Sequence, residues 1–169
     1  LLELGHLFRA QKPPVTVVVI FFDGEDFGKD VKDMLLGSTE FARQWRAVLK
    51  DVGQDVEYGI LLDMVGAKDL RIPREVNSQQ AAPWLMDAIY RHAREAGLEK
   101  VFPDEPGPQI LDDHIPLIRA GIPTVDLISF DYAYWHTLDD TPDKCSPESL
   151  KAVGEVVART VYSDIRRPR

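Results

Sequence analysis

The chain has 169 residues, the length of one domain, and 44% of them are hydrophobic, so it can bury a core without disulfide bridges. Its 20 basic and 28 acidic residues give a net charge of −8, which argues against a nucleic-acid-binding protein and against electrostatic binding to a membrane surface. The longest apolar run, residues 15–22, is too short to span a bilayer, and a single cysteine, Cys145, allows neither an internal disulfide nor a cysteine-rich zinc site.

The first half of the chain alternates helical and strand-like patterns. Residues 15–22 are β-branched and apolar on both faces, which predicts a central strand covered by helices on each side. Before this strand we expect a helix over 1–11 that ends at Pro13-Pro14. After it we expect a polar break over 23–28 and a charged loop over 29–36. A second helix follows, capped by Ser38 or Thr39, with one apolar face formed by Phe41, Trp45, Val48 and Leu49.

The second half repeats the alternation. Residues 58–65 and 124–128 are predicted strands, and 70–72 fit a short one. We expect a helix over 77–96 that ends at Gly97, with one side formed by Leu85, Ile89, Ala93 and Ala96. A short helix over 114–120 and a last helix after the cap Ser146-Pro147 follow, the last one with Leu150, Val153, Val157 and Val161 aligned. Loops are expected over 101–110 and 129–145, and a frayed tail over 166–169.

Strands that alternate with helices predict an α/β layered fold with a largely parallel sheet. In such folds ligands bind beyond the carboxyl ends of the strands. Acidic residues end or follow each long predicted strand. They are Asp23, Glu25 and Asp26 after the first, Asp63 at the end of the second, and Asp131, Asp139 and Asp140 after the third, with Asp126 inside it.

Glu25 and Asp26 are adjacent at the predicted strand end, where neighbouring side chains point in different directions. One carboxylate can bind zinc while the other acts as general base or acid on a metal-polarised substrate. The alternative is a solvated acidic turn, since Asp-Gly is common in turns.

His136 lies in a loop close to aspartates, which suits a metal ligand as well as an exposed histidine. Asp63 ends an apolar strand, where an acid is costly unless it is paired or used. Asp112 and Asp113 can cap a short helix, or can join Glu25 in a carboxylate cluster that raises at least one pKa. His114 could cap, hydrogen-bond or orient them. There is no glycine-rich phosphate loop and no nucleophile elbow around Ser38.

Six segments in this order resemble the glutaminyl cyclases, within the wider clan of zinc aminopeptidases. The segments are Phe21-Phe22-Asp23-Gly24-Glu25-Asp26, Leu36-Gly37-Ser38, Leu61-Leu62-Asp63-Met64-Val65-Gly66-Ala67, Asp112-Asp113-His114-Ile115-Pro116-Leu117, Gly121-Ile122-Pro123 and Trp135-His136-Thr137-Leu138-Asp139-Asp140. The resemblance implies a three-layer, aminopeptidase-like α/β fold with a mostly parallel central sheet. It also implies zinc-dependent cyclisation of N-terminal glutaminyl residues to pyroglutamate, with release of ammonia.

The same resemblance implies roles for individual residues. Glu25 would be the general base and acid, with Asp63 and Asp112 completing a proton-sharing network beside it. Asp26 and His136 would bind one zinc ion, and Trp135 would wall the pocket for the peptide N-terminus.

Two departures from the family pattern accompany the resemblance. The family more often has Glu where this chain has Asp26, and its first zinc-binding Asp would lie upstream of Leu1. We therefore expect residues 1–165 to form one N-terminally incomplete domain, which could self-associate through an exposed sheet edge.

Two other functions stay open beside the cyclase. One is a zinc aminopeptidase of the same clan, and the other is a catalytically inactive binding module. The compartment is open too, although the resemblance favours a secreted or periplasmic protein.

Overall fold

The computed structural model describes residues 1–30, 33–52, 56–163 and 165–168. Parts of the predicted loop 29–36, the predicted domain 1–165 and the tail 166–169 lie outside these residues. The elements in order are α1 (Leu2–Ala10), α2 (Leu36–Val48), β1 (Gly59–Asp63), α3 (Val76–Ala81), α4 (Pro83–Glu95), α5 (His114–Arg119), β2 (Thr124–Ile128), the 3-10 turn η2 (Pro142–Lys144) and α6 (Pro147–Tyr162). None of the helices in these residues is long and apolar enough to cross a membrane.

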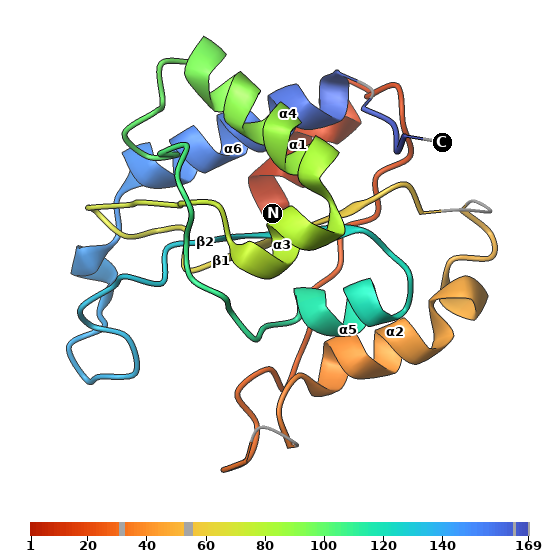
Figure 1. Ribbon diagram of the computed structural model, residues 1–169, viewed down its shortest axis with the longest axis horizontal. Helices are drawn as coiled ribbons and strands as arrows, with labels where there is room; N and C mark the ends of the chain where they lie inside the picture. The colour runs from red at the N-terminus through yellow and green to blue at the C-terminus, as the bar shows by residue number, and fades with distance from the viewer. Residues whose placement is uncertain (31–32, 53–55, 164, 169) are drawn as a thin grey trace.

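The two strands form a parallel pair in the middle of the molecule. Gly59 pairs with Thr124 and Asp63 with Ile128, so the carboxyl ends of both strands meet at one edge. Helices α1, α4 and α6 lie on one side of the strands and α2 and α5 on the other (Figure 1). The predicted α/β layering with a parallel sheet is confirmed.

Apolar side chains form two core clusters. The larger core packs buried residues of α4 and α6, among them Leu85, Ile89 and Val156, against Val125 and Leu127 of β2. A smaller core joins Trp45 of α2 to Leu117 of α5. The larger core packs on the strands and keeps them in place, so their carboxyl ends can carry polar side chains.

The segment 15–22 differs most from its prediction. It is extended but carries no strand, and Val18, Val19 and Phe21 are exposed, so the expectation of burial on both faces is wrong. A cavity of about 750 Å³ lies between this segment and β1. A strand needs a partner that accepts and donates backbone hydrogen bonds, and among the described residues none pairs with this segment.

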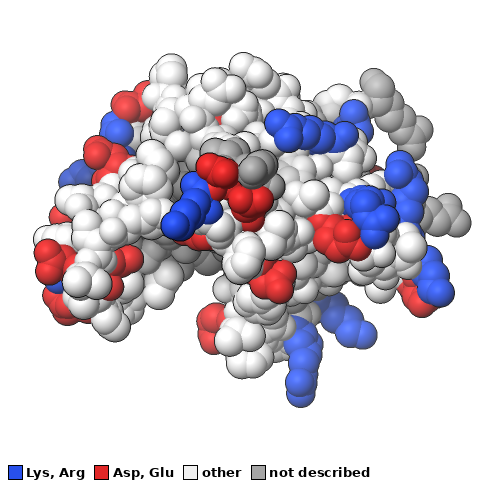
Figure 2. Space-filling model, turned by 90° about the horizontal axis from the view of Figure 1, so that it is seen from below, with Lys and Arg blue, Asp and Glu red and all other residues white. Residues whose placement is uncertain are grey.

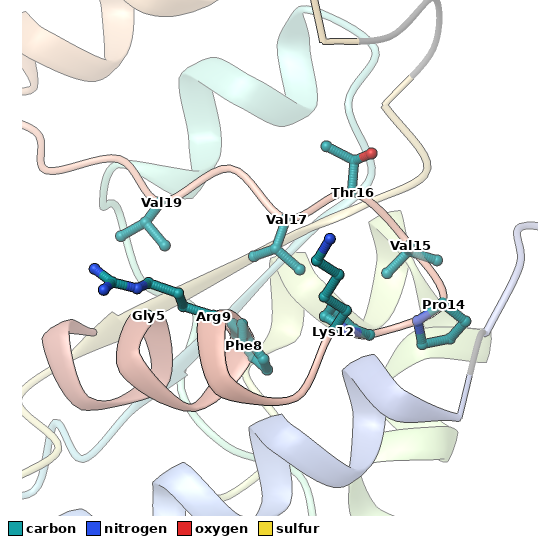
Figure 3. Close-up of a pocket in the computed structure, with 10 residues that line it drawn as sticks. Gly5, Phe8, Arg9, Lys12, Pro14, Val15, Thr16, Val17 and Val19 are labelled. Atoms are coloured by element: carbon teal, nitrogen blue, oxygen red, sulfur yellow. The ribbon is translucent and has the colours of Figure 1, made fainter.

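Figure 3 shows how the same segment faces α1. A second cavity of about 530 Å³ is lined by Phe8 of α1 and by Val15 and Val17 of the segment. Phe8 also packs edge-on against Tyr162 of α6, with ring centroids 5.8 Å apart. Val15 and Val17 are partly buried against the larger core, which also includes Leu4 of α1, so apolar packing and not a β-ladder positions this end of the segment among the described residues.

Several helix and strand predictions need smaller corrections. The helix predicted over 77–96 is two helices, because Pro83 starts α4 and Ala82 between them has non-helical dihedrals. Residues 70–72 form no strand; nearby, Arg74 makes one isolated bridge to Pro106. Helix α2 begins at Leu36, before the proposed caps Ser38 and Thr39.

Other local signals are confirmed. Ser146 caps α6 by accepting the Ser149 N–H, and Gly97 has the positive φ of 71° that ends α4. On the predicted apolar faces, Val48 and Leu150 are exposed, whereas Leu85, Ile89 and Ala93 are buried. Among the described residues on the face shown in Figure 2, acidic and basic side chains are interspersed.

Candidate active site

The loop after the segment 15–22 is tied to the start of α2 by consecutive backbone hydrogen bonds. The N–H groups of Leu35, Leu36 and Gly37 donate to the carbonyls of Glu25, Gly24 and Asp23 at 2.9, 3.2 and 2.9 Å. A Cβ on Gly37 would lie 2.7 Å from the backbone nitrogen of Asp23, so this close approach requires glycine. The two motifs Asp23-Gly24-Glu25-Asp26 and Leu36-Gly37-Ser38 thus act together to place Glu25.

Asp26 and His136 meet although 110 positions separate them. The Nε2 atom of His136 lies 2.9 Å from Oδ2 of Asp26, and both side chains are 54% exposed. His136 has a left-handed backbone, with φ of 55°. The structure therefore brings the two predicted zinc ligands together on the surface.

Trp135 lies beside this pair. Its ring stacks on the His136 ring with centroids 4.2 Å apart, and it contacts the Phe130 ring at 5.0 Å. Trp135 remains 46% exposed, so an aromatic surface is open to solvent next to the two candidate ligands. This position suits a wall for a bound peptide end.

Glu25 belongs to the electrostatic environment of both the surface pair and the interior carboxylates. Burial raises its pKa, and the charges of Asp26, Asp63 and Asp113 raise it further, whereas His136 lowers it. A carboxyl group in this environment holds a proton more readily than an ordinary glutamate. Such a group suits proton transfer.

Asp63 and Asp112 form the buried side of the cluster. Asp63 ends β1, and burial raises the pKa of its carboxyl. A hydrogen bond from the backbone N–H of Met64 lowers this pKa, whereas the charges of Asp113 and Asp26 raise it. Asp112 is 4% exposed, and burial together with the charges of Asp63, Asp113 and Glu25 raises its pKa to about 7. The expected effect of clustered carboxylates is therefore present.

Not every strand-end acid joins this cluster. Asp140 accepts a hydrogen bond from the Tyr132 hydroxyl at 2.7 Å in the exposed loop after β2, away from the buried carboxylates. Asp126 lies on the inner part of β2, fully buried, and burial raises its pKa well above the ordinary value. Asp126 thus belongs to the interior, next to His114.

Glu75 was missed by the sequence analysis. It is 1% exposed, caps α3, and lies 3.4 Å from Nε2 of the fully buried His114. A glutamate before Val76-Asn77-Ser78 does not indicate a helix cap in the sequence, because Ser, Thr, Asp and Asn are the usual N-caps. The proximity of Glu75 to His114 depends on the tertiary fold.

Asp26 and His136 fit part of a zinc site. Zinc binds imidazole nitrogen and carboxylate oxygen at about 2.0–2.2 Å, so one ion can reach two donor atoms that lie 2.9 Å apart. Among the described residues no group of three potential ligands is assembled. The residues described here therefore account for two protein donors, whereas catalytic zinc usually has three.

Comparison with known proteins assigns the chain to a family. The sequence pattern of Peptidase family M28 matches residues 1–161, nearly the whole chain. The chain belongs to peptidase family M28.

Curated members of the glutaminyl cyclase type are similar to this M28 chain. It is 30% identical to the glutaminyl-peptide cyclotransferase-like protein of Mus musculus, over 89% of this chain and 43% of that protein. It is 29% identical to the glutaminyl-peptide cyclotransferase of Bos taurus, over 86% of this chain and 45% of that protein. The chain thus spans less than half the length of these curated relatives, and the predicted resemblance is confirmed.

Solved structures agree with the M28 assignment. The glutaminyl cyclase of Bacteroides thetaiotaomicron bound to N-acetylhistamine superposes with a TM-score of 0.90 at 33% identity, covering 97% of this chain and 60% of that one. A Zn-dependent exopeptidase of Parabacteroides distasonis gives a TM-score of 0.86 at 33% identity, covering 95% and 59%. The predicted aminopeptidase-like fold is confirmed.

Proposed function

We propose that this chain carries catalytic residues of a zinc-dependent glutaminyl cyclase, which converts an N-terminal glutaminyl residue into pyroglutamate and ammonia. The observation that carries the proposal is the position of Glu25. Its pKa responds both to the Asp26–His136 pair and to the interior carboxylates Asp63 and Asp113. Similarity to named glutaminyl cyclases supports the choice of reaction.

The reaction needs one proton moved between two nitrogen atoms. The α-amine nitrogen of the substrate forms a bond to the γ-amide carbon, and the bond from that carbon to the amide nitrogen breaks. Glu25 accepts the proton that the amine loses and delivers it to the departing nitrogen, which leaves as ammonia. The raised pKa of Glu25 makes its carboxylate a stronger base for the first half of this transfer.

The neighbouring residues support this exchange. Asp63 and Asp112 line the same cavity as Glu25, and their raised pKa values favour keeping a proton within this group of carboxyls. Trp135 provides an apolar surface that orients the glutaminyl side chain. Holding the amine close to its own γ-carbonyl is mainly a problem of positioning.

Asp26 and His136 would hold the zinc ion, which when bound polarises the γ-carbonyl oxygen. The aspartate is one methylene shorter than the glutamate that the family resemblance leads us to expect, but it still supplies a carboxylate oxygen beside the imidazole nitrogen.

Glu25→Gln tests the central role. This substitution keeps the size of the side chain but removes its proton exchange, so we expect pyroglutamate formation to fall by about 10²- to 10⁴-fold. Zinc content should be unchanged, because the ligands Asp26 and His136 remain. The matched control is Glu99→Gln, on an exposed glutamate far along the sequence from the site. An active Glu25→Gln variant would remove the role assigned here.

An aminopeptidase of the same family is the second candidate, favoured by the exopeptidase neighbour. There Glu25 would deprotonate a water molecule instead of the substrate amine. Mass spectrometry of a Gln-initiated peptide separates the two reactions: loss of ammonia indicates the cyclase, and release of the first amino acid indicates the peptidase. A folded protein that does neither would be a binding module.

Two further expectations from the sequence accompany this proposal. The resemblance favours a secreted or periplasmic protein. Self-association would use the edge of the sheet, where the outer side of β1 has no strand partner among the described residues.

A further inference from the structure

Glu75 is a buried carboxylate with four hydrogen-bond donors. Its Oε1 atom accepts the N–H groups of Asn77 at 2.9 Å and of Ile110 at 3.0 Å. Its Oε2 atom accepts the N–H and the hydroxyl of Ser78, both at 2.6 Å. Burial opposes ionisation of Glu75, but His114 and these donors outweigh it and lower its pKa to about 2. Glu75 is therefore a permanent negative charge inside the protein.

Glu75 contacts the segment that carries Asp112 on both sides of that residue. Two residues before Asp112, the N–H of Ile110 donates to Glu75, and the Ile110 carbonyl accepts from the Asn77 side chain at 2.7 Å. Two residues after Asp112, Nε2 of His114 lies 3.4 Å from the Glu75 carboxylate. The backbone before Asp112 is thus hydrogen-bonded to the first turn of α3, whereas after Asp112 the His114 ring approaches Glu75 without forming a hydrogen bond.

The same anchor extends to β2. The Asp126 N–H donates to the Ser78 hydroxyl at 2.9 Å, and Nδ1 of His114 lies 3.6 Å from Oδ2 of Asp126. Glu75, Ser78 and His114 are all buried, so water competes little for these contacts. Three elements, α3, α5 and β2, therefore share one polar cluster behind the carboxylates.

The Asp112 side chain itself has little holding it. Its Oδ1 accepts the N–H of Asp113 at 2.5 Å, and its Oδ2 has no hydrogen-bond partner among the described residues. The carboxyls around it, Asp63, Asp113 and Glu25, repel its charged form. The position of the Asp112 carboxyl therefore depends on its backbone.

We propose that Glu75 is a positioning residue for Asp112, acting through Ile110 and His114. For its catalytic consequence the inference rests on the proposed function. A short Asp or Ser is the usual cap for a helix such as α3. The longer glutamate side chain also reaches Ile110 and approaches His114, which a cap alone does not require.

The test compares Glu75→Gln with Ser146→Ala, which removes the cap of α6, in the protein at its natural length. In Glu75→Gln an NH₂ group replaces one of the two accepting oxygens, so hydrogen bonds from N–H donors are lost and the backbone around Asp112 is held less firmly. We expect kcat for cyclisation of a Gln-initiated peptide to fall by about 10- to 100-fold, with KM within about 2-fold. In Ser146→Ala, melting temperature should fall while kcat stays within about 2-fold.

A second readout does not need turnover. In ¹³C NMR titrations, the pKa of the Asp112 carboxyl should fall from about 7 toward its ordinary value in Glu75→Gln, because the loosened group gains solvent. Ser146→Ala should leave it unchanged. If the wild type makes no pyroglutamate, the proposed function fails, and this titration alone decides the positioning role.

Equal kcat and equal Asp112 titration in the two variants would overturn the inference. If Glu75→Gln does not fold, Glu75→Asp replaces it, because the shorter carboxylate can still cap α3 but should no longer reach the Ile110 N–H and His114. The same two readouts then apply: a lower kcat with a lower Asp112 pKa supports positioning, and no change in either contradicts it.

Discussion

The candidate site has an exposed half and a buried half, and they differ in how they are built. Asp26, His136 and Trp135 lie in loops and remain about half exposed. Asp63 and Asp112 lie at a strand end and before a helix, and Asp112 is almost fully buried. The exposed half presents donor atoms and an aromatic ring to solvent, whereas the buried half controls proton affinity.

The difference shows which part of the fold each task requires. A ligand site needs access, so loops can carry it once they are oriented. A raised pKa needs exclusion of water, which only packed elements provide. Substitutions in the exposed half should therefore change binding with little change in stability, and substitutions in the buried half should change stability with pH.

The largest expected effect belongs to the exposed half. His136→Ala removes one of the two proposed zinc ligands, so we expect zinc affinity to fall by at least about 100-fold. Melting temperature without zinc should barely change, because the side chain is 54% exposed. Elemental analysis of the protein at its natural length measures the metal, with the exposed His6→Ala as control. Unchanged zinc content would show that His136 is no ligand.

The buried half gives the next largest effect, as a pH dependence. The unfolded chain ionises Asp112 near its ordinary pKa of 3.8, whereas the folded protein holds this proton up to about pH 7. The folded state thus binds more protons in this range, and the free energy of unfolding falls as pH rises from about 4 to 7. Asp112→Asn cannot ionise, so it should lack this decline.

Thermal unfolding at several pH values measures this effect. At pH near 8, Asp112→Asn should be more stable than the wild type by an amount on the order of 4 kcal/mol, and at pH near 4 the two should be similar. Asp69→Asn, on an exposed aspartate, is the control. Parallel curves for wild type and Asp112→Asn would mean that Asp112 does not hold its proton in the folded state.

The smallest effect should come from the aromatic ring in the exposed half. Trp135→Ala removes the stacked surface beside His136, and we expect KM for a Gln-initiated peptide to rise by about 3- to 10-fold. Trp135→Phe, which keeps an aromatic face, should recover most of the loss. A fall in kcat at constant KM would instead place Trp135 in the orientation of His136.

Local signals in the sequence predicted the elements that depend on local interactions. Residues 124–128 form β2 as expected, and Ser146 caps α6. The segment 15–22 has equally strong β-branched composition, yet it forms no strand, because pairing depends on a neighbour. Pro83 divides the helix predicted over 77–96, a break that proline chemistry could have indicated.

The site was predictable to the extent that it follows strand ends. The rule that ligands gather there selected Glu25 and Asp63, and the structure places both in one electrostatic cluster. The meeting of Asp26 with His136 also agrees with the family resemblance. Glu75 was not predicted from the sequence, because its four donors and its approach to His114 arise only when α3, α5 and β2 pack together.

The left-handed backbone of His136 has a consequence for the entropy of metal binding. A φ of 55° is unfavourable for an L-residue, by about 1–2 kcal/mol, so neighbouring contacts must maintain it. Stacking on Trp135 and the contact with Asp26 are available for this task. The imidazole of this proposed ligand is then oriented before any ion arrives, so the side chain would lose little conformational freedom on binding a metal.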